Sequence, residues 1–177
     1  MTRKVRIFPH NDLLNLAHFN LGVINEHVGK DDHEGLALHC MNCIVSTAFA
    51  VEAFINFMGS KKVEKWNERT KWYKKLQQIC KAVGYEYNLD KDPLATIEKV
   101  KDIRNELAHG KPIEKMVEVG SKDELKQAME SPWSQCCTPE YANISYEQVN
   151  IFINEVIAKS GLKIFDTLTS SNGESNA

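Results

Sequence analysis

The sequence predicts an all-α protein, a helical bundle of four main helices plus a short additional helix. Apolar residues recur at helical spacing through most of the 177 residues, and no alternating pattern persists long enough to build a sheet. A chain of this length forms one domain with a sizeable core. We expect the helical domain over residues 11–168, an N-terminal arm over 1–10 and a disordered tail over 169–177.

The first two helices are predicted from their apolar residues and their caps. Residues 11–28 form the first helix, with an asparagine or aspartate as its N-cap. The second helix starts at Asp32 or His33 and runs to Met58. It is apolar on nearly every face, so we expect it at the centre of the bundle or at a subunit interface.

The next two helices carry many charged residues beside an apolar stripe. The third is expected over residues 63–83. The fourth begins at Asp92-Pro93, because aspartate is a favoured N-cap and proline a favoured first helical residue. It stops at His109-Gly110.

Residues 113–142 are the least regular part of the chain. A capping box predicts one short helix there, over residues 122–130. The pair Thr138-Pro139 indicates a loop. The last helix is expected over residues 145–168.

The composition favours a soluble, cytoplasmic protein with no membrane partner. The net charge of −2 leaves no basic field of the kind that binds duplexes tightly, so RNA binding would need a local patch. The start of the chain has no apolar segment typical of a signal peptide. The longest apolar stretch, residues 44–58, is interrupted by Glu52 and Asn56, and we expect it to be too short and too polar to span a bilayer.

The chain has five cysteines, an odd number that argues against a disulfide framework. Cys40 and Cys43 form a C-x-x-C pattern inside an apolar helix, where small buried thiols are expected. A zinc site that includes Cys136 and Cys137 is one alternative, and a redox role is another. The histidines outside the fourth helix show no metal-ligand spacing, so we expect no metal and no cofactor.

Two charged residues lie where apolar residues are expected. Arg104 emerges beside the stripe of Ile97 and Val100 on the fourth helix, and Glu52 lies in the most apolar helix. An unpaired charge in such a position costs on the order of several kcal/mol. We therefore expect Glu52, with Asn56 on the same helical face, to meet Arg104 across the two helices.

His109 closes the fourth helix five residues after Arg104. On an ideal helix the two residues lie about 140° apart, and Asn105 shares the face of the histidine. A long arginine side chain or a loosened last turn would bring the three polar ends together. A histidine beside a fixed cation suits phosphodiester cleavage without a metal, because the histidine moves protons and the arginine stabilises charge on the phosphorus centre.

The stretch RNELAH, residues 104–109, resembles the R-x4-6-H signature of HEPN domains, in which a polar residue commonly follows the arginine. The stretch VEAFIN, residues 51–56, is similar to the acidic, apolar second long helix often seen in that family. The resemblance implies an all-α HEPN-like bundle. It also implies a metal-independent endoribonuclease, a hydrolase of toxin–antitoxin, phage-defence or RNA-processing systems.

The same resemblance implies roles for four residues. Arg104 and His109 are the catalytic pair, Asn105 orients the histidine or contacts the phosphate, and Glu52 orients the arginine. It further implies a homodimer whose two motifs face one composite cleft for the RNA substrate. One alternative is a non-catalytic HEPN-like module that pairs with a partner such as a nucleotidyltransferase antitoxin. Others are RNA or nucleotide binding without turnover, and a structural salt bridge with a helix-capping histidine.

Basic and aromatic residues alternate before and along the third helix. Its lysines, from Lys61 to Lys75, are expected to form a solvated face, with guidance of RNA as the alternative. Trp66 and Trp72 are expected to pack in the core or an interface, with stacking on bases as the alternative.

Overall fold

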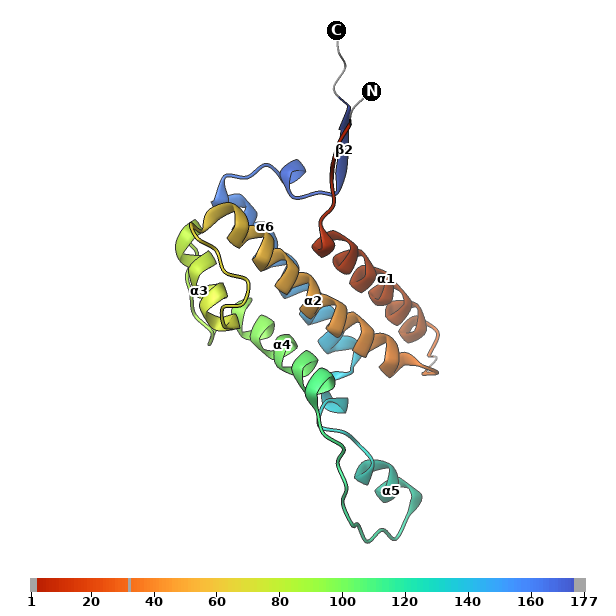
Figure 1. Ribbon diagram of the computed structural model, residues 1–177. Coiled ribbons are helices and arrows are strands. Elements are labelled where there is room, and N and C mark those ends of the chain that lie inside the picture. Colours follow the sequence, from red (N-terminus) through yellow and green to blue (C-terminus); the bar gives the residue numbers. More distant parts are fainter. Residues whose placement is uncertain (1–2, 32, 174–177) are drawn as a thin grey trace.

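The structure is a computed structural model that describes residues 3–31 and 33–173 of the chain. Figure 1 shows a bundle of helices with two paired strands projecting from one end. The helices are α1 (Pro9–Gly29), α2 (Leu36–Lys62), α3 (Trp72–Val83), α4 (Leu94–His109), α5 (Lys122–Ala128) and α6 (Pro139–Ser160). The other elements are β1 (Arg3–Arg6), β2 (Ser170–Gly173) and the 3-10 helices Ser134–Cys136 and Ile164–Asp166.

The all-α prediction is confirmed, but the expected number of main helices is wrong. In the described part of the chain α1, α2, α3, α4 and α6 all build the bundle, which makes five helices beside the short α5. Although α3 has only 12 residues, it buries Leu76 and Ile79 in the same core as Phe54 and Phe152. A short helix with a strong apolar stripe therefore contributes to the core as the longer ones do.

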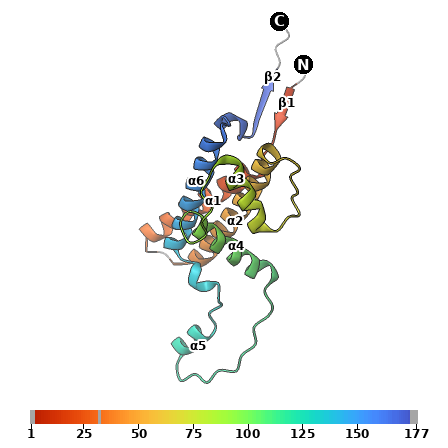
Figure 2. The same ribbon diagram turned by 90° about the vertical axis from the view of Figure 1, so that its left-hand side faces the viewer.

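The central helix is α2, as its apolar composition predicts. It contacts α1, α3, α4 and α6, and Figure 2 shows these helices around it. Because α2 is apolar on nearly every side, burial among several helices removes more apolar surface from water than packing on one face would. Phe54, Ile55 and Met58 have no exposed surface.

The start of α3 differs from the prediction for a local reason. The helix begins at Trp72 rather than near residue 63. Lys65 has a left-handed backbone conformation, and the Asn67 side chain accepts a hydrogen bond from the Arg69 N–H at 2.9 Å. Such side-chain bonds compete with helical bonding, so the segment before Trp72 forms turns.

The bounds of α6 also differ from the prediction. The helix starts at Pro139 rather than at residue 145, because Thr138 Oγ1 accepts a hydrogen bond from Tyr141 N at 3.2 Å and serves as its N-cap. It ends at Ser160, where Gly161 adopts a left-handed conformation that stops a helix. Thr138-Pro139 is therefore a helix start and not a loop.

The remaining helices start and end within four residues of the expected positions. Asp32, one of the two expected starts of α2, lies outside the described residues.

The N-terminal arm and the C-terminal tail pair with each other as the antiparallel strands β1 and β2. Beside them, His10 is buried and its Nε2 lies 3.0 Å from the Thr167 carbonyl oxygen. The expectation of a disordered tail is therefore wrong for residues 170–173, while residues 174–177 lie outside the described part. Strands of four residues are too short to show an alternating pattern, so this pairing could not be predicted from the sequence.

Residues 111–133 leave the bundle as a long loop that carries α5, visible in Figures 1 and 2 and named here the α5 loop. The predicted short helix and its Ser121 cap are confirmed, but the returning bond of the capping box goes to Gly120, one residue before the N-cap. Ser121 Oγ accepts a hydrogen bond from Glu124 N at 3.2 Å, and Glu124 Oε2 accepts one from Gly120 N at 2.6 Å. No residue of α5 is buried, so local capping, and not packing on the bundle, stabilises this helix.

Candidate functional site

The helix α4 ends with the motif, residues 104–109. Its N-cap is Pro93 and its first residue is Leu94, one position later than the predicted Asp92 and Pro93. Asp92 still binds this end of the helix, because its Oδ1 accepts hydrogen bonds from Thr96 N at 3.2 Å and Thr96 Oγ1 at 2.7 Å. The helix stays regular through His109, and Gly110 N donates to the Glu106 carbonyl oxygen at 2.7 Å. A Cβ at Gly110 would overlap that oxygen, so glycine is required at this helix end.

The predicted contact between Glu52 and Arg104 is confirmed. Arg104 Nη2 donates a hydrogen bond to Glu52 Oε2 across the α2–α4 contact. The guanidinium also lies over the ring of Phe49, with 5.0 Å between Cζ and the ring centroid. Arg104 Nε is buried and has no hydrogen-bond partner among the described residues. The arginine is thus oriented by one carboxylate and one ring, with donor capacity left over.

Lys75 is a member of this site that sequence reasoning missed. It was expected on the solvated face of the third helix, but it is only 4% exposed. Its Nζ donates to Asn56 Oδ1 at 3.1 Å and lies 3.7 Å from Glu52 Oε1. Asn56 therefore binds the lysine, whereas we had expected it to join Glu52 in meeting Arg104. We call Glu52, Asn56, Lys75 and Arg104 the Arg104 cluster.

Asn105 and His109 lie outside the Arg104 cluster. Asn105 is half-buried and His109 is exposed, and no hydrogen bond or ion pair between described residues joins either to Glu52 or Arg104. The last turn of α4 is not loosened, so a regular helix keeps Arg104 and His109 about 140° apart. Within one chain, the structure brings together Glu52 and Arg104 but not the proposed catalytic pair.

Both tryptophans near α3 pack against the core, in agreement with their expected role. Trp66 lies so close to Gly59 that a Cβ there would overlap its ring. Trp72 is half-buried and its Nε1 donates to Glu98 Oε2 at 2.8 Å. Both indole rings are therefore engaged in contacts within the chain.

All five cysteines are free, and four of them are buried. Burial raises the pKa of Cys40, Cys43 and Cys80 to about 11, so these thiols remain protonated near neutral pH. The expectation of buried thiols, made for Cys40 and Cys43, is confirmed, and Cys80 is buried as well. Across residues 3–31 and 33–173, no group of three or more His, Cys, Asp and Glu side chains is arranged to hold a metal ion.

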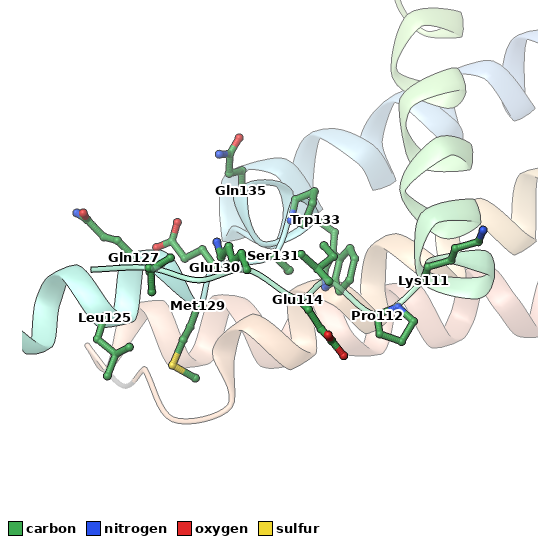
Figure 3. Close-up of a pocket in the computed structure, with 15 residues that line it drawn as sticks. Lys111, Pro112, Glu114, Leu125, Gln127, Met129, Glu130, Ser131, Trp133 and Gln135 are labelled. Carbon is green, nitrogen blue, oxygen red and sulfur yellow. The ribbon is translucent and has the colours of Figure 1, made fainter. Parts of the chain in front are cut away.

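A hollow of about 880 Å³ lies within the α5 loop and the turn that follows it (Figure 3). Its lining comes entirely from residues 111–135. Figure 3 shows Leu125 and Met129 on the α5 side and Trp133 on the returning segment. Trp133 is half-buried against the core, whereas the other large apolar side chains of the loop are exposed: Ile113, Met116, Val117, Val119, Leu125 and Met129. The sequence marked this segment only as irregular.

Comparison with family models, with curated proteins and with solved structures finds no match. Among the described helices, α2 is long and apolar enough to span a membrane by length and composition alone, with a mean hydropathy of 1.5. A core helix passes the same test, and 56% of the tested window of α2 is buried, so the expectation that residues 44–58 do not span a bilayer stays a prediction. In the fold α2 is the central helix of the bundle.

Proposed function

We propose that the chain is a metal-independent endoribonuclease of HEPN type, a toxin or phage-defence effector that acts as a cytoplasmic homodimer. The observation that carries the proposal is the ion pair between Glu52 and Arg104. It orients the arginine of the R-x4-6-H motif, whose side chain is 17% exposed and whose buried Nε has no partner among the described residues. An arginine held in this way is pre-organised for a phosphate.

The proposed reaction is transfer of the RNA phosphodiester to the neighbouring 2′-oxygen. His109 accepts the proton of the ribose 2′-hydroxyl, and the 2′-oxygen attacks phosphorus while the bond to the leaving 5′-oxygen breaks. The 5′-oxygen takes up a proton from an imidazolium or from water. Arg104 stabilises the additional negative charge on the phosphorus centre. The products are a 2′,3′-cyclic phosphate, which hydrolysis opens to a 3′-phosphate, and a 5′-hydroxyl end.

The geometry of α4 favours a site shared by two copies of the chain. Arg104 faces α2 and His109 is exposed on another side of the helix end, so one chain alone does not direct both at one phosphate. A symmetric pair of chains would place the histidine of one copy opposite the arginine of the other. Asn105, half-buried between the two positions, would orient the imidazole or contact the phosphate.

The test is RNA cleavage by the purified chain in EDTA, with the products analysed for 2′,3′-cyclic phosphate. We expect the wild type to cleave and the Arg104→Ala, His109→Ala double variant to be inactive with an unchanged circular dichroism spectrum. The matched control is the double variant Arg69→Ala, His33→Ala, which removes the same residue types at exposed positions. Loss of cleavage on adding EDTA, or equal cleavage by the catalytic double variant, would contradict the proposal.

A second candidate function is a non-catalytic HEPN-like module that pairs with a partner such as a nucleotidyltransferase antitoxin. The exposed apolar side chains of the α5 loop favour it, because clustered apolar surface marks partner sites. This function predicts no RNA cleavage and a stable complex with the product of the neighbouring gene. Ile113→Asp and Met129→Asp would then weaken the complex, whereas substitution of exposed Lys81 would not.

A further inference from the structure

We propose that Lys75 is a positioning residue that keeps Arg104 available for a phosphate group. The inference rests on the proposed function, because it assigns this phosphate to the RNA backbone. Lys75 itself is only 4% exposed, so it acts through Glu52 and not by contact with RNA.

The two oxygens of the Glu52 carboxylate serve two different cations. Arg104 Nη2 binds Oε2, and Lys75 Nζ lies 3.7 Å from Oε1. Asn56, one helical turn after Glu52, accepts a hydrogen bond from the same ammonium at 3.1 Å and fixes its position. The lysine therefore occupies the side of the carboxylate that would otherwise be available to a second N–H of the arginine.

This sharing determines the charge of the site. An arginine and a carboxylate alone readily form a bidentate, neutral pair, which leaves little attraction for an anion. With Lys75 present, two cations share one carboxylate, and one positive charge remains unneutralised. Part of that charge resides on a guanidinium whose Nε has no acceptor among the described residues.

The chemistry of the site fits a phosphate or a phosphodiester. The planar fork of a guanidinium matches two oxygens of a tetrahedral phosphate. The Arg104 side chain keeps 17% of its surface exposed, and Phe49 beside it is 42% exposed, so this edge of the cluster is open to solvent. An anion at this edge would reach the arginine but not the buried lysine.

The test uses inorganic phosphate as the probe and follows the Arg104 side-chain N–H resonances by NMR in the full chain. We expect saturable shifts in the wild type and an affinity about tenfold lower in Lys75→Met, the effect of losing one charge-assisted interaction. Lys75→Arg should retain most of the affinity, since it keeps the charge. Lys75→Gln provides a second neutral variant if Lys75→Met does not fold. Lys74→Met, a neighbouring exposed lysine, is the matched control and should bind as the wild type does.

Three outcomes separate this inference from the proposed ribonuclease. Equal phosphate affinity in the wild type and the neutral Lys75 variants would overturn the inference, because a merely structural lysine would change only the melting temperature. Failure of the wild type to bind phosphate at Arg104 would overturn it as well. Phosphate binding that depends on Lys75, in a chain that cleaves no RNA, would support the inference and contradict the ribonuclease.

Discussion

The two halves of the proposed motif differ in how firmly the fold holds them. Arg104 is oriented by Glu52 and stacked on Phe49. His109, five residues later, is exposed at the end of α4, directly before the α5 loop. One half of the motif is thus organised within a single chain, and the other half lies where a second surface could meet it.

This difference follows from where α4 lies on the bundle. Its first three turns pack on α2 and α6, so the apolar residues Ile97 and Val100 are buried and Arg104 needs a partner. In its last turn only Leu107 still packs against the core, where it is partly buried, whereas Ala108 and His109 are exposed. The comparison predicts that changes in the packed region affect stability, whereas changes at the open end affect activity or partner binding.

The largest expected effect comes from the packed region. Phe54→Ala removes a fully buried ring at the centre of the core, and we expect it to lower the free energy of unfolding by about 3–5 kcal/mol. Met116→Ala, at a fully exposed position of the α5 loop, should change it by less than about 0.5 kcal/mol. Urea unfolding of both variants measures the contrast. Equal losses would mean that the α5 loop packs on the bundle in solution.

A smaller effect is expected within the Arg104 cluster. Glu52→Ala leaves Arg104 and Lys75 without their shared carboxylate, and we expect a loss of about 1–2 kcal/mol because Glu52 is partly solvated. His109→Ala should leave the free energy of unfolding unchanged to within about 0.5 kcal/mol. Thermal and urea unfolding of the two variants provide the comparison. A large loss in His109→Ala would contradict the open placement of this residue.

The smallest expected effect is the pH dependence of stability that comes from His10, which lies beside the paired strands β1 and β2. Burial lowers the pKa of His10 from its ordinary value of 6.5, so the folded state keeps this ring neutral. As the pH falls through 6.5, the unfolded chain binds a proton that the folded chain does not, and stability is lost toward the lower folded pKa. His10→Gln removes this dependence. The wild type should therefore lose more stability than the variant between about pH 7.5 and about pH 5.5, and parallel curves would contradict the assignment.

The part of the site that the sequence predicted is the part with only one physical solution. Glu52 and Arg104 both interrupt apolar surfaces. Each charge would destabilise the fold if it were left unpaired there, so the two are expected to form an ion pair. Lys75 was missed because it stands among exposed lysines, although Trp72 three residues before it and Ile79 four residues after it place it on the apolar stripe of α3. Its partner could not be predicted, since only the fold brings Asn56 beside it.

The fold was predictable to a similar extent. The apolar surface of α2 specified its central position, and the capping residues specified α4 and α5. The start of α6 was missed because Thr138-Pro139 is typical both of a loop and of a helix start. The pairing of β1 with β2 joins segments about 160 residues apart, and four-residue strands carry no periodic signal.

The most direct test of the central claim, that Arg104 and His109 act together across two copies, uses mixed dimers. Arg104→Ala and His109→Ala chains with different tags are coexpressed, and the mixed species is purified through both tags. Our account predicts that each variant alone is inactive in EDTA, whereas the mixed dimer cleaves RNA because one copy supplies the arginine and the other the histidine. A silent mixed dimer, beside an active wild-type dimer prepared in the same way, would contradict it.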